Sequence, residues 1–143
     1  MQDIDQLVYL LYRFYTYSGV AEKGLGYNVK SSRDFISSLI NADYGVLLVS
    51  DENGILTGTI GGMLVPWMGD SSQYILLESW WWVNPESRGT GGRLIKSFEK
   101  EGREKGAKFL IMMTLDSDKE KSLETFYQRF GMQHLEHHYM KEL

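Results

Sequence analysis

An apolar run that leads into a glycine-rich turn constrains the fold of this chain most strongly. The run, YILLESWWWV, consists mainly of strand-forming residues and predicts a strand from about Tyr74 to Val83, which Pro85 ends. A helical segment follows the glycines, and KFLIMMTL at residues 108–115 predicts the next strand. A strand, helix and strand in this order usually make a parallel pair. We therefore expect a parallel pair between these two strands, in a sheet whose faces helices cover.

The helix after the glycines has a clear buried side and a clear end. The buried side consists of Leu94, Ile95 and Phe98, and the opposite side is charged. Gly106 can adopt the left-handed conformation that ends a helix.

Two further helices are predicted before the strands. The first spans residues 2–18, with apolar side chains at three- and four-residue spacing at Ile4, Leu7, Val8, Leu11, Phe14 and Tyr15. The second begins at Ser31 and Ser32, whose hydroxyls can cap free amides. Its expected buried face is Phe35, Ile36, Leu39 and Ile40.

Residues 44–65 predict an antiparallel hairpin. YGVLLVS and ILTGTIGGMLV are rich in strand formers, and Asn53-Gly54 supplies the positive-φ pair of a tight turn. Residues 66–73 are expected to form a loop.

The last part of the chain predicts a helix and a final strand. Ser117 and Glu120 have the spacing of a capping box, and Gly131 closes the helix. Its buried side is expected to include Leu123, Phe126, Tyr127 and Phe130. A strand over about 133–141 ends the chain. Together these elements predict an α/β (α+β) fold in one domain, 1–143, whose mixed central sheet of about six strands is flanked by about four helices.

Composition excludes several kinds of chemistry. The 143 residues contain no cysteine, which removes disulfides, thiolate nucleophiles and cysteine-ligated zinc. The net charge of −4 and the scattered basic residues make nucleic acid an unlikely partner. The first residues, MQDIDQ, are acidic where a signal peptide would be basic, and no apolar run approaches the ~18 residues of a membrane span. We expect a cytoplasmic protein.

The glycines at residues 89–92 lie between a strand and a helix, where backbone amides can face an anion. Arg93-Leu94 follows the last glycine, so the Lys-Ser or Lys-Thr of a nucleotide triphosphatase loop is absent. The spacing also fails the dinucleotide fingerprint G-x-G-x-x-G. An ordinary strand-to-helix connection is the alternative interpretation.

VNPESRGTGGRLI, KGAKFLIMMTL and LETFYQRFGM resemble the GNAT superfamily of acetyl-CoA-dependent N-acetyltransferases, in an order of elements that covers nearly the whole chain. The resemblance implies that the loop binds the pyrophosphate of coenzyme A through Arg88, Gly89, Thr90, Gly91, Gly92 and Arg93. The family signature is R/Q-x-x-G-x-G/A. Aligning Arg88 with its first position puts Arg93 where a small residue is expected, whereas aligning Glu86 replaces the arginine by a carboxylate. A loop shortened by about two residues accounts for both departures.

The resemblance also implies two catalytic groups and the path of the pantetheine arm. Glu78 interrupts an apolar strand, where a carboxylate is costly unless paired or used; similar proteins use such a glutamate as general base, and the alternative is a structural carboxylate. Tyr127 looks like the family tyrosine that protonates the leaving sulfur, with core packing as its alternative. The arm is expected along main-chain groups near Trp82, Val83 and Asn84.

Other aromatic and histidine residues are weaker candidates. Trp80 and Trp82 should lie on one face of the sheet and Trp81 on the other. These tryptophans either belong to the strand that borders the pantetheine arm or fill the core. Trp67 and Met68 could line an acceptor pocket or simply pack. His134, His137 and His138 alternate along an extended segment without a supporting metal motif, so no metal is predicted.

The sequence thus predicts an N-acetyltransferase that moves an acetyl group from acetyl-CoA directly to a primary amine of a small molecule or peptide. Two alternatives stay open: a non-catalytic module that binds acyl-CoA or a protein, and acetylation of an amine on a macromolecule. The final strand and the exposed aromatic residues would permit a homodimer.

Overall fold

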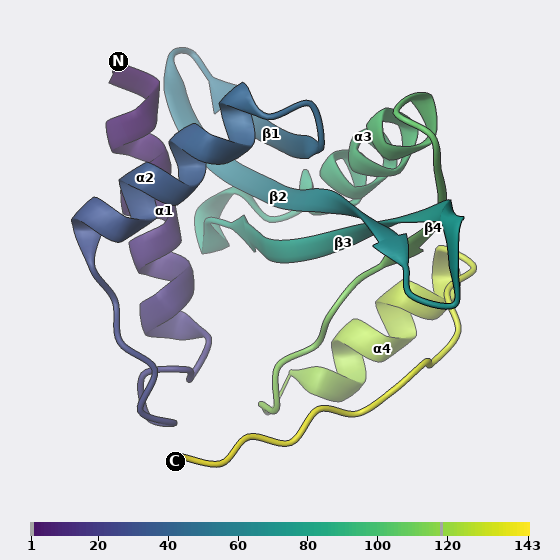
Figure 1. The fold of residues 1–143 in the computed structure, drawn as a ribbon. Coiled ribbons are helices and arrows are strands. Elements are labelled where there is room, and N and C mark those ends of the chain that lie inside the picture. Colours follow the sequence, from purple (N-terminus) through teal and green to yellow (C-terminus); the bar gives the residue numbers. More distant parts are fainter. Residues whose placement is uncertain (1, 118) are drawn as a thin grey trace. The chain divides into compact units, whose positions relative to one another are not determined.

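The computed structural model describes residues 2–117 and 119–143 (Figure 1). The chain divides into two compact units, the first ending at Met113 and the second comprising Thr114–Leu143. The first unit contains α1 (Gln2–Tyr17), α2 (Val29–Asn41), β1 (Gly45–Glu52), β2 (Ile55–Trp67), β3 (Asp70–Val83), the short 3-10 helix η1 (Pro85–Ser87), α3 (Gly91–Glu104) and β4 (Ala107–Ile111). The second contains α4 (Glu120–Arg129). None of the described helices is long and apolar enough to cross a membrane.

The sheet has the strand order β1-β2-β3-β4. The first three strands are antiparallel, and β3 pairs with β4 in parallel, which confirms the predicted parallel pair. Asn53 and Gly54 have φ values of 58° and 86°, so the predicted tight turn between β1 and β2 is also confirmed.

The first unit has three layers, with α1 and α2 on one face of the sheet and α3 on the other (Figure 1). The core on the first face consists of Leu7, Val8, Leu10, Leu11, Ile36, Leu39, Leu56, Trp80 and Trp82. On the second face, Leu94, Ile95 and Phe98 of α3 are buried as predicted. The predicted alternation of the tryptophans is confirmed, because Trp81 lies against Gly91 of α3.

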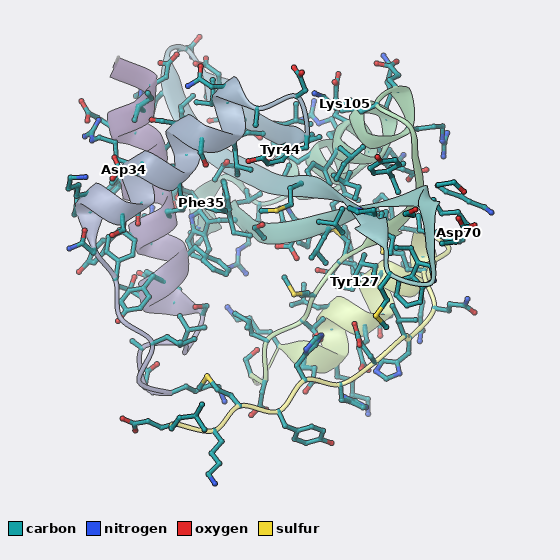
Figure 2. All side chains as sticks on the ribbon, viewed as in Figure 1. Asp34, Phe35, Tyr44, Asp70, Lys105 and Tyr127 are labelled. Carbon is teal, nitrogen blue, oxygen red and sulfur yellow. The ribbon has the colours of Figure 1, made fainter. Side chains whose placement is uncertain are left out.

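The start of α2 differs from the prediction. The helix begins at Val29, and the side chain of Asn28 caps it by accepting a hydrogen bond from the Ser31 amide (2.9 Å). Of the expected face only Ile36 and Leu39 are buried. Phe35, labelled in Figure 2, is 38% exposed and Ile40 is 52% exposed.

Most of the predicted loop at residues 66–73 is strand. β2 continues through Trp67 and β3 begins at Asp70, so only Met68 and Gly69 connect them. Cross-strand pairing persists to the turn, with Pro66 opposite Tyr74. Asp70 accepts hydrogen bonds from both the amide and the hydroxyl of Ser72, which stabilises the turn.

The predicted sheet of about six strands is wrong, because the described residues form four. The strand expected at 108–115 ends at Ile111, and residues 133–141 form no strand. A strand forms only with a pairing partner and an apolar face to bury. Residues 133–141 are exposed throughout, the apolar Leu135, Tyr139 and Met140 included, and they pair with no strand of the described residues. The α+β class itself is correct.

The predicted capping box of α4 is also wrong, since the helix begins at Glu120 without a side-chain cap. The carbonyl of Ser117 instead accepts a hydrogen bond from the Glu120 amide (3.1 Å). Gly131, with φ of 77°, closes the helix as predicted. Tyr127 is the buried residue of α4, whereas the other three predicted positions are only half-buried.

Candidate active site

β3 and β4 pair along only part of their length. The last pair is Leu77 with Ile111, whereas β3 continues to Val83. One edge of β3 therefore extends beyond β4 within the first unit. Main-chain groups along this edge can pair with an extended ligand in the way that a neighbouring strand would.

A β-bulge between β2 and β3 lies next to the point where β4 separates from β3. Gly61 of β2 pairs with Trp80, but the next residue, Gly62, pairs with Glu78, so Ser79 has no partner in β2. The extra residue reverses the alternation of side chains and turns Trp80 toward α1 and α2. Glu78 thus stands at the bulge, in the segment where pairing with β4 has just ended.

Glu78 is buried, and its carboxylate accepts a hydrogen bond from the main chain. The residue is 5% exposed, and the amide of Met113 donates to its Oε2 (3.0 Å). Burial raises the pKa of the Glu78 carboxyl to about 7, and the Met113 amide offsets this rise only in part. A carboxylate with this pKa can accept a proton near neutral pH.

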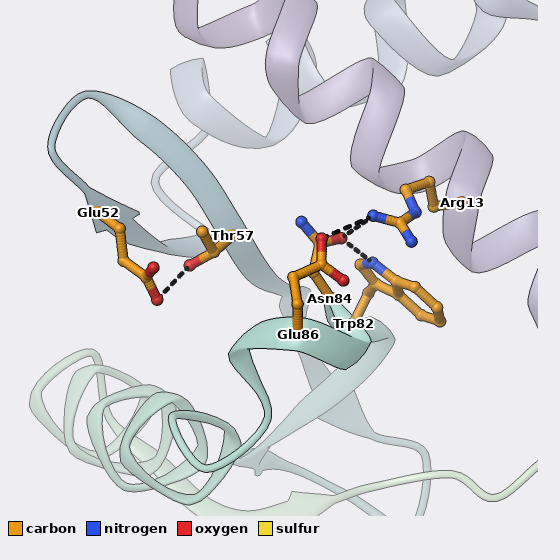
Figure 3. Close-up of polar contacts among 6 residues, drawn as sticks. All are labelled: Arg13, Glu52, Thr57, Trp82, Asn84 and Glu86. Atoms are coloured by element: carbon orange, nitrogen blue, oxygen red, sulfur yellow. Dashed lines mark hydrogen bonds and ion pairs between the residues drawn. The ribbon is translucent and has the colours of Figure 1, made fainter.

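The end of β3 is fixed by the side chain of Asn84 (Figure 3). Asn84 is 7% exposed, and its Oδ1 accepts from Arg13 (2.9 Å) and from Nε1 of Trp82 (3.0 Å). The main-chain N–H of Asn84 donates to the carbonyl of Thr57 in β2 (2.8 Å). Because main-chain groups alternate between the two edges of a strand, those of Val83 point away from β2. The main-chain N–H and C=O of Val83 therefore lie at the edge of β3 that faces away from β2, beyond its last pair with β4.

The loop between η1 and α3 presents bare backbone. Within the part of the chain that the structure describes, the amides of residues 89–92 donate no hydrogen bond, and those of Arg93 and Leu94 donate to the carbonyl of Thr90. Gly89 has φ of 121°, which favours glycine. A Cβ added at Gly91 would lie 2.8 Å from Cζ2 of Trp81. This loop at the positive end of a 14-residue helix fits an anion such as a pyrophosphate.

The charged residues around the loop differ in their surroundings. The side chains of Arg88 and Arg93 are exposed. Glu86 is turned toward α1, where its Oε1 lies 3.4 Å from NH1 of Arg13. Since the Arg93 amide is already hydrogen-bonded within the helix, its guanidinium is the group that can reach an anion.

Every site residue predicted from the sequence except Tyr127 lies in the first unit. Tyr127 lies on α4 in the second unit (Figure 2), with its ring against Phe126 at a centroid distance of 6.2 Å. Its carbonyl accepts from the amides of Phe130 and Met132. The pairing of Tyr127 with Glu78 in catalysis stays a prediction.

Arg13 is the residue at this site that the sequence prediction missed. A signal was present, since Arg13 stands between Tyr12 and Phe14, beside the buried stripe of an amphipathic helix. The weaker candidates Trp67 and Met68 lie at the β2–β3 turn, where Met68 is 92% exposed. No group of three or more residues able to hold a metal ion occurs among the described residues.

The model of the acetyltransferase (GNAT) family matches residues 6–132 of this chain. No curated protein matches it.

Solved structures with the same fold include three acetyltransferases. Aminoglycoside N-acetyltransferase AAC(6')-Iy, in complex with the bisubstrate analogue CoA-S-monomethyl-acetylneamine, is 16% identical with a TM-score of 0.74, covering 99% of this chain and 92% of that one. Aminoglycoside acetyltransferase meta-AAC0020 from an uncultured soil metagenomic sample, in complex with sisomicin, is 14% identical with a TM-score of 0.73, covering 99% and 89%. Ribosomal-protein-alanine N-acetyltransferase from Brucella melitensis biovar Abortus 2308 is 13% identical with a TM-score of 0.71, covering 99% and 93%. At these identities the likeness shows the fold alone.

Proposed function

The chain belongs to the GNAT family of acetyltransferases, and on that premise we propose that it transfers the acetyl group of acetyl-CoA to the nitrogen of a primary amine. The observation that carries the proposal is the buried carboxylate of Glu78, located where β3 and β4 separate. Its pKa of about 7 suits a group that must gain and lose a proton near neutral pH.

Acetyl-CoA supplies the acetyl group as an activated thioester. The amides of residues 89–92 are proposed to hold its pyrophosphate at the start of α3, with the guanidinium groups of Arg88 and Arg93 adding charge. The main chain of Trp82, Val83 and Asn84 is proposed to hold the pantetheine arm, with Val83 as the residue whose groups face the outer edge.

Glu78 is proposed to act as the general base. An alkyl ammonium ordinarily has a pKa of about 10, so it must lose a proton before its nitrogen can attack. Above pH 7 the Glu78 carboxylate is mostly ionised and can take that proton, directly or through a water molecule.

Tyr127 is proposed to act as the general acid. The pKa of an ordinary phenol is about 10, close to that of an alkyl thiol, so its Oη proton can be given to the leaving sulfur. The resemblance of LETFYQRFGM to the GNAT segment that carries the tyrosine general acid supports this role.

The acceptor is proposed to be a small molecule with a primary amine. Two of the solved structures that share the fold are aminoglycoside acetyltransferases, one bound to the bisubstrate analogue CoA-S-monomethyl-acetylneamine and the other to sisomicin, which supports this class. An amine on a peptide is the second candidate, supported by the ribosomal-protein acetyltransferase that shares the fold.

Calorimetric titration and thiol release test the proposal together. Acetyl-CoA should bind the chain, and a panel of amines that includes aminoglycosides, polyamines and peptide amino termini should contain one that accelerates release of free CoA. The Glu78→Gln variant should bind acetyl-CoA like the wild type and release thiol more slowly. Absence of acetyl-CoA binding at millimolar ligand would refute the proposal. Tight binding without amine-stimulated release would favour the non-catalytic alternative.

A further inference from the structure

Arg13 joins α1 to the segment that precedes the glycine loop (Figure 3). Its NH1 donates to Oδ1 of Asn84 at 2.9 Å and lies 3.4 Å from Oε1 of Glu86. The guanidinium carbon also lies 5.7 Å from the ring centroid of Tyr17 and 5.8 Å from that of Trp82. Only 18% of the Arg13 side chain is exposed. A long side chain held by this many partners has little rotational freedom.

These contacts fix the backbone where the strand turns toward α3. Asn84 is the first residue after β3, and its carbonyl accepts from the amide of Ser87 at 2.9 Å across η1. Arg13 therefore holds both ends of the short segment from Asn84 to Glu86. The bare amides of residues 89–92 follow directly, so their position depends on this segment.

The charge of Arg13 also acts on this segment. Glu86 is two residues before Arg88, and its side chain is 65% exposed. An uncompensated carboxylate here would repel an anion at the neighbouring amides, because exposed charges interact over a Debye length of about 8 to 10 Å. Arg13 offsets that charge from the side of α1.

We propose that Arg13 is a positioning residue for the acyl-CoA site: it holds the side chain of Asn84 and neutralises Glu86, so that the glycine loop presents its amides to the pyrophosphate. The inference rests on the proposed function, and it assigns to α1 a part in cofactor affinity. In this role Arg13 acts through Asn84 and Glu86 and takes no part in the chemical step.

A double-mutant cycle on CoA binding tests the inference. The variants are Arg13→Gln, Arg13→Lys, Glu86→Gln and the double variant Arg13→Gln/Glu86→Gln, with CoA affinity measured by calorimetry and folding by urea denaturation. The matched control is Arg33→Gln, which breaks another arginine–carboxylate pair, the exposed one with Asp5 between α1 and α2.

Arg13→Gln should raise the Kd for CoA about tenfold, and the double variant should return to within about threefold of the wild type, because a few-ångström charge pair at a protein surface contributes on this scale. Arg13→Lys should fall between Arg13→Gln and the wild type, since it keeps the charge but loses the planar donor geometry. KM for acetyl-CoA should rise with Kd while kcat stays within about twofold, as expected when binding alone is weakened. Arg33→Gln should leave the Kd unchanged.

The outcomes separate the inference from the function on which it rests. A wild-type chain that binds no CoA refutes both. A wild type that binds CoA, with Arg13→Gln and Arg13→Lys folded and unchanged in Kd, refutes the inference alone and assigns Arg13 to stability. Effects of Arg13→Gln and Glu86→Gln on the Kd that simply add would refute the neutralising role.

Discussion

Replacement of Glu78 by glutamine should change how the stability of the fold depends on pH. Burial raises the pKa of this carboxyl from 4.5 to about 7 in the folded chain. Below the unfolded value both states carry the protonated acid, and the shift has no effect on the free energy of unfolding. Between the two values only the unfolded state ionises, so the folded chain loses stability as the pH rises. Well above pH 7 both states are ionised, and the loss is complete and constant.

The size of this loss follows from the pKa shift. One pKa unit corresponds to about 1.4 kcal/mol, so a carboxyl shifted from 4.5 to about 7 lowers the free energy of unfolding by about 3 kcal/mol in total. Most of this loss, about 2 to 3 kcal/mol, falls between roughly pH 5 and roughly pH 8. The amide side chain in the Glu78→Gln variant cannot ionise, so the variant lacks this pH-dependent loss, although its amide oxygen can still accept from Met113.

Urea denaturation of the wild type and Glu78→Gln at roughly pH 5 and roughly pH 8 measures how the free energy of unfolding of each depends on pH. The free energy of unfolding of the variant relative to the wild type should increase by about 2 to 3 kcal/mol from roughly pH 5 to roughly pH 8. Glu22→Gln, which removes an exposed carboxylate between α1 and α2, controls for the loss of one negative charge. Identical pH dependence for wild type and Glu78→Gln would show that the carboxyl has an ordinary pKa and refute the reasoning.

The same variant tests the proposed base. In the wild type, kcat/KM for the amine should rise through about pH 7 as Glu78 ionises. Glu78→Gln should have lower turnover and lack that rising limb. An unaltered pH profile would assign Glu78 to a structural role.

Three other substitutions probe separate parts of the chain. Tyr127→Phe should lower kcat by about 10- to 100-fold with little change in CoA affinity, as for loss of a general acid, and unchanged turnover would reject Tyr127 as the acid. Gly91→Ala places a Cβ 2.8 Å from the Trp81 ring, so it should displace the start of α3 and weaken CoA binding in a calorimetric titration; wild-type affinity would argue against the loop as the anion site. Gly62→Ala places a Cβ 2.2 Å from the carbonyl oxygen of Leu77, so urea denaturation should show a destabilisation of about 3 kcal/mol or more, and a loss below about 1 kcal/mol would contradict the geometry.

Features set by neighbouring residues in the sequence were predictable. Asn53-Gly54 makes its turn because both residues tolerate positive φ, and Gly106, with φ of 95°, ends α3 for the same reason. The buried stripe of α3 follows from helical spacing. The candidate site residues lie on the elements where they were expected, since strand, loop and helix follow one another directly in the chain.

Features that depend on distant contacts were not predictable from local pattern. The unpaired Ser79 arises from the register between β2 and β3, which no spacing within β3 reveals. The contact of Arg13 with Asn84 joins residues 71 positions apart. The absence of a strand at residues 133–141 has a similar origin, because strand formation requires a partner as well as suitable residues.

The open edge of β3 bears on how a family can diverge in sequence and still keep its ligand. If the pantetheine arm pairs with the main chain of Val83, that part of recognition belongs to the peptide bond and is independent of the side chain. Substitutions along this edge can then accumulate as long as the strand keeps its path. Solved proteins at 13% to 16% identity have the same fold, so the path of the backbone is kept although most side chains differ. Selection on cofactor binding would act here on backbone shape, and would leave the acceptor side free to change.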